Sequence, residues 1–186
     1  MLKNVTITGY KPNELGIFKR DHPSVEFIKK AILKELVPLI EEGLEWVIIS
    51  GQLGVELWAA EVVFDVQAVF PEVKLAVLTP FFSQEEKWSD VNKEWYESIL
   101  AQADFVEAIT HKPYESPKQF ILKNQVLLHK SDIAIIMYDS ENEGSPKFFF
   151  EAAKRYRETK DYQIREITFY DLQLIVEEEM SKRIDE

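Results

Sequence analysis

The sequence predicts an α/β protein built as a Rossmann-like three-layer αβα sandwich with a mostly parallel sheet. Three observations support this fold. Short apolar, β-branched runs recur along the chain, segments of helix length separate them, and the runs are apolar enough to be covered on both faces. Strands that are covered on both faces are typical of parallel sheets, because the connecting helices pack on each side.

Six apolar runs are expected to form the strands of this sheet. They are Asn4–Thr8, Trp46–Ser50, Val73–Thr79, Phe105–Thr110, Ile133–Tyr138 and Ile164–Thr168. The helix expected over 55–70 has one apolar stripe at helical spacing, formed by Val55, Ala59, Val62, Val66 and Val69. This stripe predicts that the helix packs on the sheet.

Two Ser-Pro pairs predict further helix starts. In Ser116-Pro117 and Ser145-Pro146, the serine hydroxyl is a good N-cap. The proline that follows has no N–H group, which costs nothing in the first turn of a helix. We therefore expect a helix to begin at each pair.

Composition narrows the domain count and the class of partner. The 186 residues are 46% apolar, which suits one well-packed domain over 1–186. The net charge of −11 argues against nucleic acid and anionic membrane surfaces as partners. The chain has no cysteine, which excludes disulfides and thiolate chemistry. It also begins without signal-peptide features. We expect a cytoplasmic protein.

The strand ends predict where a ligand would bind. In a parallel sheet the carboxyl ends of the strands share one edge, and ligands bind in the crevice outside it. The pairs expected at this edge are Thr8-Gly9, Ser50-Gly51, Thr79-Pro80, Thr110-His111 and Tyr138-Asp139. Hydroxyl side chains are also common in strands and turns without a ligand, so the pattern alone leaves both readings open.

Two of only six glycines stand in the stretch "SGQLGVE", between an expected strand and an expected helix. Gly51 and Gly54 allow a positive φ and allow a ligand to approach main-chain N–H groups. The start of the following helix favours an anion such as phosphate. Tight strand-to-helix turns use glycine without any ligand as well. Neither a Walker A nor a G-x-G-x-x-G motif is present, which disfavours a P-loop ATPase or an ordinary dinucleotide dehydrogenase.

Glu56, in the first turn of the expected helix, is the candidate acidic residue. It satisfies the helix dipole by itself and would repel a phosphate beside it. We expect it to accept hydrogen bonds from ribose hydroxyls or an amine, with the phosphate nearer Gly9 or Ser145. A role as general acid or base is the alternative. Lys11 is a candidate phosphate contact.

Aromatic and histidine residues complete the candidate site. Tyr10 and Phe81 are the first candidates to stack on a base, whereas the four tryptophans are expected to be packing residues. The three histidines have no metal-ligand spacing, so we expect no metal site.

Several motifs together resemble one known family. They are "ITGYKPNELGIF" (7–18), "IISGQLGVELWAAE" (48–61), "TPF" (79–81), "THKPYESPKQF" (110–120), "KNQ" (123–125), "KSD" (130–132) and "YDSENEGSPK" (138–147). From Met1 to about Asp171 the chain resembles the YpsA proteins of Gram-positive bacteria. These belong to the SLOG superfamily of Rossmann-like domains, alongside the DprA proteins and the LOG phosphoribohydrolases.

The resemblance implies a pocket for a nucleotide or nucleotide-derived ligand and a link to cell division or stress regulation. It places one wall of the pocket at Thr8, Gly9, Ser50, Gly51, Gln52, Gly54 and Glu56. The opposite wall consists of Tyr138, Asp139, Gly144 and Ser145. The LOG enzymes carry "PGGxGTxxE" with a catalytic glutamate, whereas this chain reads "ENEGSPKFFFE" over 141–151. This departure weakens the case for hydrolysis of an N-glycosidic bond.

Three functions therefore stay open. The first is a binding protein for a small phosphorylated nucleoside-type ligand, such as an ADP-ribose or NAD relative, that signals through a protein partner. The second is a nucleotide hydrolase of the phosphoribohydrolase type that uses Glu56. The third is an interaction protein with a vestigial pocket. No cofactor is assigned beyond the nucleotide-like ligand.

Overall fold

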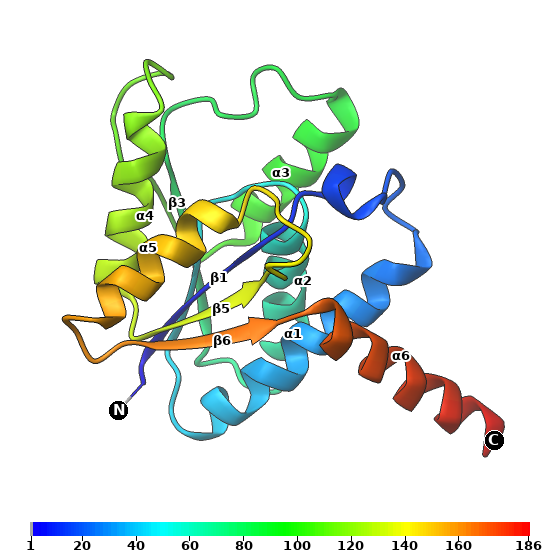
Figure 1. Ribbon diagram of the computed structural model, residues 1–186. Coiled ribbons are helices and arrows are strands. Elements are labelled where there is room, and N and C mark those ends of the chain that lie inside the picture. The colour runs from blue at the N-terminus through cyan, green and yellow to red at the C-terminus, as the bar shows by residue number, and fades with distance from the viewer. Residues whose placement is uncertain (1) are drawn as a thin grey trace.

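A six-stranded, all-parallel sheet forms the centre of the computed structural model, which describes residues 2–186 (Figure 1). The strands are β1 (Asn4–Gly9), β2 (Trp46–Ile49), β3 (Lys74–Thr79), β4 (Phe105–Ala108), β5 (Ile133–Met137) and β6 (Gln163–Ile167). Their order in the sheet is β4-β3-β2-β1-β5-β6. All six predicted strands are confirmed, and so is the predicted sheet. The order reverses between β1 and β5, which lie side by side at the middle of the sheet.

Helices cover both faces of the sheet and complete the three layers. They are α1 (Pro23–Glu41), α2 (Val55–Val66), α3 (Asp90–Gln102), α4 (Lys118–Lys130), α5 (Lys147–Arg157) and α6 (Phe169–Ile184). The helix α1 packs against α2 and α6, α2 packs against α3, and α4 packs against α5. Figure 1 shows α4 and α5 on the face opposite α1 and α2, with the end of α6 leading away from the sheet.

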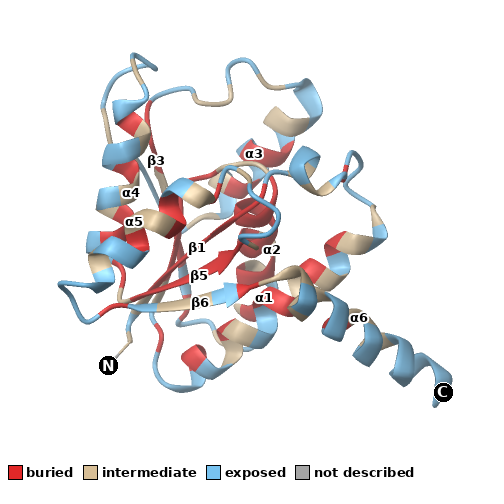
Figure 2. Ribbon diagram, viewed as in Figure 1, coloured by how far each residue is buried: buried red, intermediate tan, exposed pale blue. Residues whose placement is uncertain are grey.

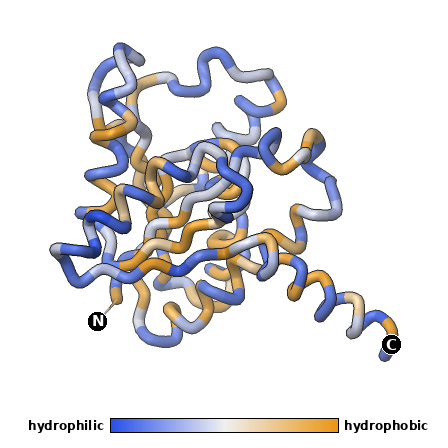
Figure 3. The backbone as a smooth tube through the Cα atoms, viewed as in Figure 1, coloured by the Kyte–Doolittle hydropathy of each residue, from blue (hydrophilic) through white to orange (hydrophobic). Residues whose placement is uncertain are grey.

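Burial is greatest in the middle of the sheet and falls at its edges. Nearly every residue of β1, β2, β3 and β5 is buried or half-buried, and these strands form the apolar centre of the molecule (Figures 2 and 3). The edge strand β4 differs from the expectation of two covered faces, because Phe105 and Val106 are both exposed. It also ends at Ala108, before the predicted Thr110, where the chain turns toward α4.

The ends of the helices differ in detail from the sequence prediction. The helices α4 and α5 begin at the two predicted Ser-Pro pairs, but the N-cap residues are Pro117 and Pro146, and neither helix has a side-chain cap. The hydroxyl of Ser145 does not cap α5, because it donates to Glu14 Oε1 at 2.6 Å. The helix α2 also ends at Val66, short of the expected Phe70.

Candidate functional site

The predicted edge residues follow neighbouring strands in space. The register places Thr8 of β1 beside Ile136 of β5, and Ile49 of β2 beside Val77 of β3. Because these strands are parallel, their carboxyl ends open onto the same edge, where α2, α4 and α5 begin. The structure therefore brings together the strand ends that the sequence analysis assigned to one site.

A buried carboxylate lies at the centre of this edge. Glu56, on the first turn of α2, is only 2% exposed. Its Oε1 accepts hydrogen bonds from the Ser50 backbone N–H at 2.7 Å and from the Ser50 hydroxyl at 2.8 Å. Its Oε2 accepts from the Thr8 hydroxyl at 3.0 Å. Glu56 thus joins the ends of β1 and β2 to α2, and both hydroxyls point at it.

The glycine loop, residues 51–54, has the backbone conformation that the sequence predicted. The φ angles of Gly51 and Gly54 are 85° and 93°. The room beside these glycines is filled by the protein itself. A Cβ on Gly51 would lie 2.8 Å from the Tyr96 ring, and one on Gly54 would collide with the carbonyl oxygen of Tyr10. Close packing of the chain on itself therefore requires both glycines.

The backbone N–H groups of the glycine loop have no acceptor in the part of the chain that the structure describes. Those of Gly51, Gln52, Leu53 and Gly54 form no hydrogen bond there, whereas the next N–H, of Val55, donates to the carbonyl oxygen of Tyr10 at 3.1 Å. These groups precede the first turn of α2, the positive end of its helix dipole. The loop is therefore able to donate hydrogen bonds to an anion.

Tyr10 closes the crevice between β1 and β5. Its hydroxyl donates to the carbonyl oxygen of Asn142 at 2.6 Å and accepts from the Asp139 N–H at 2.8 Å. Its ring is stacked on Phe169 with the centroids 5.5 Å apart, and the Tyr138 ring lies 5.9 Å away. Burial raises the pKa of the Tyr10 hydroxyl. The ring that the sequence suggested for base stacking is therefore stacked on protein side chains.

Glu14 binds the segment around Ser145, on the opposite wall of the predicted pocket. Its carboxylate accepts from the backbone N–H of Ser145 at 2.7 Å and from the Ser145 hydroxyl. Burial alone would raise the pKa of Glu14, but these hydrogen bonds and one from the Lys11 N–H outweigh it and hold the pKa below its ordinary value. Gly144 lies against Glu14 and the Tyr10 ring, with no room for a side chain.

The remaining predicted residues organise the loop that follows β4. The carbonyl oxygen of Pro80, after Thr79, accepts from the Thr110 hydroxyl at 2.7 Å. The Phe81 ring packs against Tyr114 and Phe120, with centroids 5.2 and 5.5 Å away. These residues support the edge from the side of β3 and β4.

Two polar side chains on the inner face of α4 were missed as site residues. Lys123 is 9% exposed, and its ammonium forms no ion pair or hydrogen bond with any residue between 2 and 186. Burial lowers its pKa, the charge of Glu56 opposes that shift, and the charge of Lys11 adds to it. The neighbouring Asn124 has a buried Oδ1 that is without a hydrogen-bond partner in the described chain.

The sequence did carry a signal for Lys123. It lies four positions after Gln119 and four before Leu127, which are both buried. A lysine at this spacing belongs to the packed face of the helix rather than to its solvated face. Lys123 and Asn124 belong to the motif "KNQ" (123–125), which pointed only to the family resemblance and not to the site.

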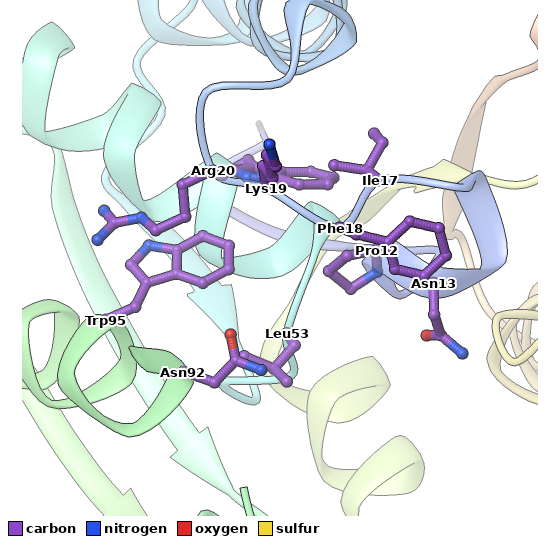
Figure 4. Close-up of a pocket in the computed structure, with 10 residues that line it drawn as sticks. Pro12, Asn13, Ile17, Phe18, Lys19, Arg20, Leu53, Asn92 and Trp95 are labelled. Carbon is purple, nitrogen blue, oxygen red and sulfur yellow. The ribbon is translucent and has the colours of Figure 1, made fainter. Parts of the chain in front are cut away.

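A recess of about 310 Å³ lies beside the glycine loop (Figure 4). Leu53 of the loop, Trp58 of α2 and Trp95 of α3 contribute to it, together with residues of the β1–α1 connection. The two tryptophans are nearly fully buried, as expected of packing residues. Two kinds of feature are absent from residues 2–186. No group of three or more acidic or histidine side chains could hold a metal ion, and no helix is both long and apolar enough to cross a bilayer.

These features define a Rossmann-like α/β protein with a buried polar cluster at the carboxyl edge of its sheet. Residues 5–172 match the model of the YpsA family, described as "YspA SLOG family". The chain belongs to this family. It is 59% identical over 178 residues to proteins named "UPF0398 protein" from Bacillus thuringiensis (strain Al Hakam) and Bacillus cereus (strain AH187). Each match covers 96% of this chain and 97% of the relative.

Proposed function

We propose that the protein binds a small phosphorylated ligand of the nucleoside type at the carboxyl edge of the sheet. The observation that carries this proposal is the pair of polar groups on α4, the Lys123 ammonium and the Asn124 carbonyl oxygen. The Asn124 oxygen is buried without a hydrogen-bond partner among the described residues. Lys123 is only 9% exposed as a residue and forms no ion pair there. Burying an unpaired polar group costs about 1–3 kcal/mol, and burying an unpaired charge costs more. A ligand that satisfied both groups would remove this cost.

The chemistry of the edge fits the parts of such a ligand. Lys123 and Lys11 supply positive charge in a chain whose net charge is −11. The N–H groups of Gly51 to Gly54 supply donors at the start of α2, as phosphate sites do. Asn124 Oδ1 needs a donor, which a ribose hydroxyl or a base amine would provide. An ADP-ribose or NAD relative carries all of these groups.

The state of Glu56 favours binding over hydrolysis. Both carboxylate oxygens are held by Ser50 and Thr8. To act as a general acid or base, Glu56 would have to release these partners and reach a ligand from a nearly closed position. The proposal is therefore a regulatory binding protein that works in the cytoplasm, whose ligand-bound form a protein partner recognises. The link of the family to cell division or stress is part of this proposal.

A ligand panel with matched variants tests the proposal. Purified protein is heated with ADP-ribose, NAD, AMP or ribose 5-phosphate. A ligand at 100 times its dissociation constant stabilises the fold by about 2.7 kcal/mol, which raises the melting temperature by several degrees. We expect Lys123→Met to abolish the shift. Lys130→Met, an exposed lysine on the same helix, should leave it unchanged.

The outcomes separate the three functions. No shift with any ligand would favour the interaction protein with a vestigial pocket, and an equal shift in both lysine variants would place the ligand elsewhere. Product analysis follows any hit. Turnover that Glu56→Gln abolishes while binding survives would favour the hydrolase.

A further inference from the structure

The recess beside the glycine loop has a wall held in place by one carboxylate, that of Glu61 on α2. The indole Nε1–H of Trp95 donates to Glu61 Oε1 at 2.8 Å. The ammonium of Lys29 lies 2.6 Å from Oε2, and an Arg20 guanidinium nitrogen lies 3.5 Å from Oε1. The Arg20 guanidinium also lies over the Trp95 ring, 5.2 Å from its centroid. This network connects α1, α2, α3 and the β1–α1 connection, so the wall is already in place without a ligand.

Flat and apolar surfaces form most of the recess. Figure 4 shows Trp95 on one side of the open space and Phe18 on the other, with Leu53 between them. Phe18 is 81% exposed, which leaves its ring free to cover a ligand. The volume of about 310 Å³ lies at the lower end of the range for small-molecule sites. The recess therefore fits a single planar ring system better than an extended dinucleotide.

The charge of the recess is opposite to that of the chain. The residues that line it include two cations, Lys19 and Arg20, and no acidic residue. Acidic residues outnumber basic ones by 33 to 22 in the whole chain. Lys19 forms no ion pair within residues 2–186, and two lining amides, of Asn13 and Asn92, have side chains without a hydrogen-bond partner there. The polar groups at the rim suit an anionic group.

We infer that this recess binds the planar ring of a small aromatic anion, with the anionic group at Lys19 and Arg20. The ring would lie against Phe18 and over Leu53, next to the Arg20 guanidinium that covers the nearly buried Trp95. The site adjoins the proposed ligand site at Leu53 of the glycine loop, but neither Lys123 nor Asn124 lines it. Its occupancy does not depend on the proposed function.

A matched pair of probes tests the charge preference. Indole-3-acetate and indole-3-acetamide have nearly the same shape and differ by one negative charge. Binding is followed through the amide and indole N–H signals of ¹⁵N-labelled protein. We expect the acetate to bind about two- to fivefold more tightly, the range for partly exposed ion pairs, and to shift the signals of Trp95 and Leu53. Arg20→Gln together with Lys19→Gln should remove the preference.

Variants of exposed aromatic residues test the position of the ring. Phe18→Ala should weaken binding by about threefold or more, because an aromatic contact is lost without disturbing the fold. Phe82→Ala is the matched control, since Phe82 is also exposed but does not line the recess. Lys123→Met should leave binding of the acetate unchanged. Equal binding of acetate and amide, equal effects of the two phenylalanine variants, or loss of binding in Lys123→Met would overturn the assignment.

Discussion

The Thr8 hydroxyl donates a hydrogen bond to Glu56 Oε2 at 3.0 Å, and this bond ties the end of β1 to the first turn of α2. Together with the bonds from Ser50, it satisfies a carboxylate that is almost wholly removed from water. Hydrogen bonds to a charged group are stronger than those between neutral groups, and leaving such a group unpaired is costly. The site is therefore built on a connection between three elements of the fold.

Replacing Glu56 with glutamine tests this connection. The amide nitrogen of Glu56→Gln cannot accept a hydrogen bond, so either the Ser50 donors or the Thr8 hydroxyl lose their acceptor. We expect the free energy of unfolding to fall by about 1–3 kcal/mol. Urea unfolding measures this change. Glu86→Gln, at an exposed glutamate, is the control and should change stability little. Equal stabilities of the two variants would show that Glu56 holds nothing together.

Patterns within single segments were enough to predict most of the fold. The apolar runs predicted six strands, and their apolar character on both faces predicted a parallel sheet, because the residues of the central strands are buried or half-buried. The exposure of β4 was not predictable in this way. The run around Phe105 is apolar except for Glu107, and its place at the edge of the sheet leaves it open to solvent.

The candidate site was predicted in its location but not in its contacts. Placing Thr8 and Ser50 at one edge required only that the strands be parallel. Both hydroxyls donate to Glu56 because α2 places its side chain between them. A pattern of residue types does not contain these side-chain positions. Lys123 is distant in sequence from all of them, and it reaches the cluster only because α4 packs against the sheet.

Two glycine substitutions separate backbone strain from close packing. Gly54 and Gly43 both have positive φ, 93° and 103°, so alanine is strained at each. A Cβ at Gly43 meets nothing within 4 Å, whereas one at Gly54 collides with the Tyr10 carbonyl oxygen and lies 2.9 Å from Pro12. We expect Gly54→Ala to reduce stability by about 1 kcal/mol or more beyond Gly43→Ala. Chemical denaturation of both variants measures the difference, and a smaller loss for Gly54→Ala would contradict the packing argument.

Tyr10 should control the mobility of the loop after β5. In Tyr10→Phe the ring stays, but the Asp139 N–H loses its acceptor and the Asn142 carbonyl loses its donor. We expect a loss of about 1–3 kcal/mol in stability and faster hydrogen exchange at the Asp139 amide. Tyr170→Phe is the control, because Tyr170 is 66% exposed. Unchanged exchange at Asp139 would mean that other contacts hold the loop.

The buried ammonium of Lys123 should make stability depend on pH in a defined direction. Burial lowers its pKa in the folded protein below the ordinary value of 10.5. The charge of Glu56 opposes this shift, and repulsion from Lys11 adds to it. At a pH between the lowered pKa of the folded protein and the ordinary pKa of the unfolded chain, the unfolded chain binds more protons at Lys123 than the folded chain. Stability from this residue therefore rises with pH in that interval and is lost as the pH falls.

Lys123→Met removes this contribution and isolates it from other titrating groups. We expect the variant to be more stable than the natural protein near neutral pH, because an unpaired buried charge is gone. The gap should narrow as the pH is raised through the folded pKa of Lys123 toward the ordinary value of 10.5, because the natural protein gains stability relative to the variant there. Urea unfolding across this range measures both curves, with Lys130→Met as the exposed control. Curves that stay parallel would show that Lys123 titrates in the folded protein as it does in the unfolded chain.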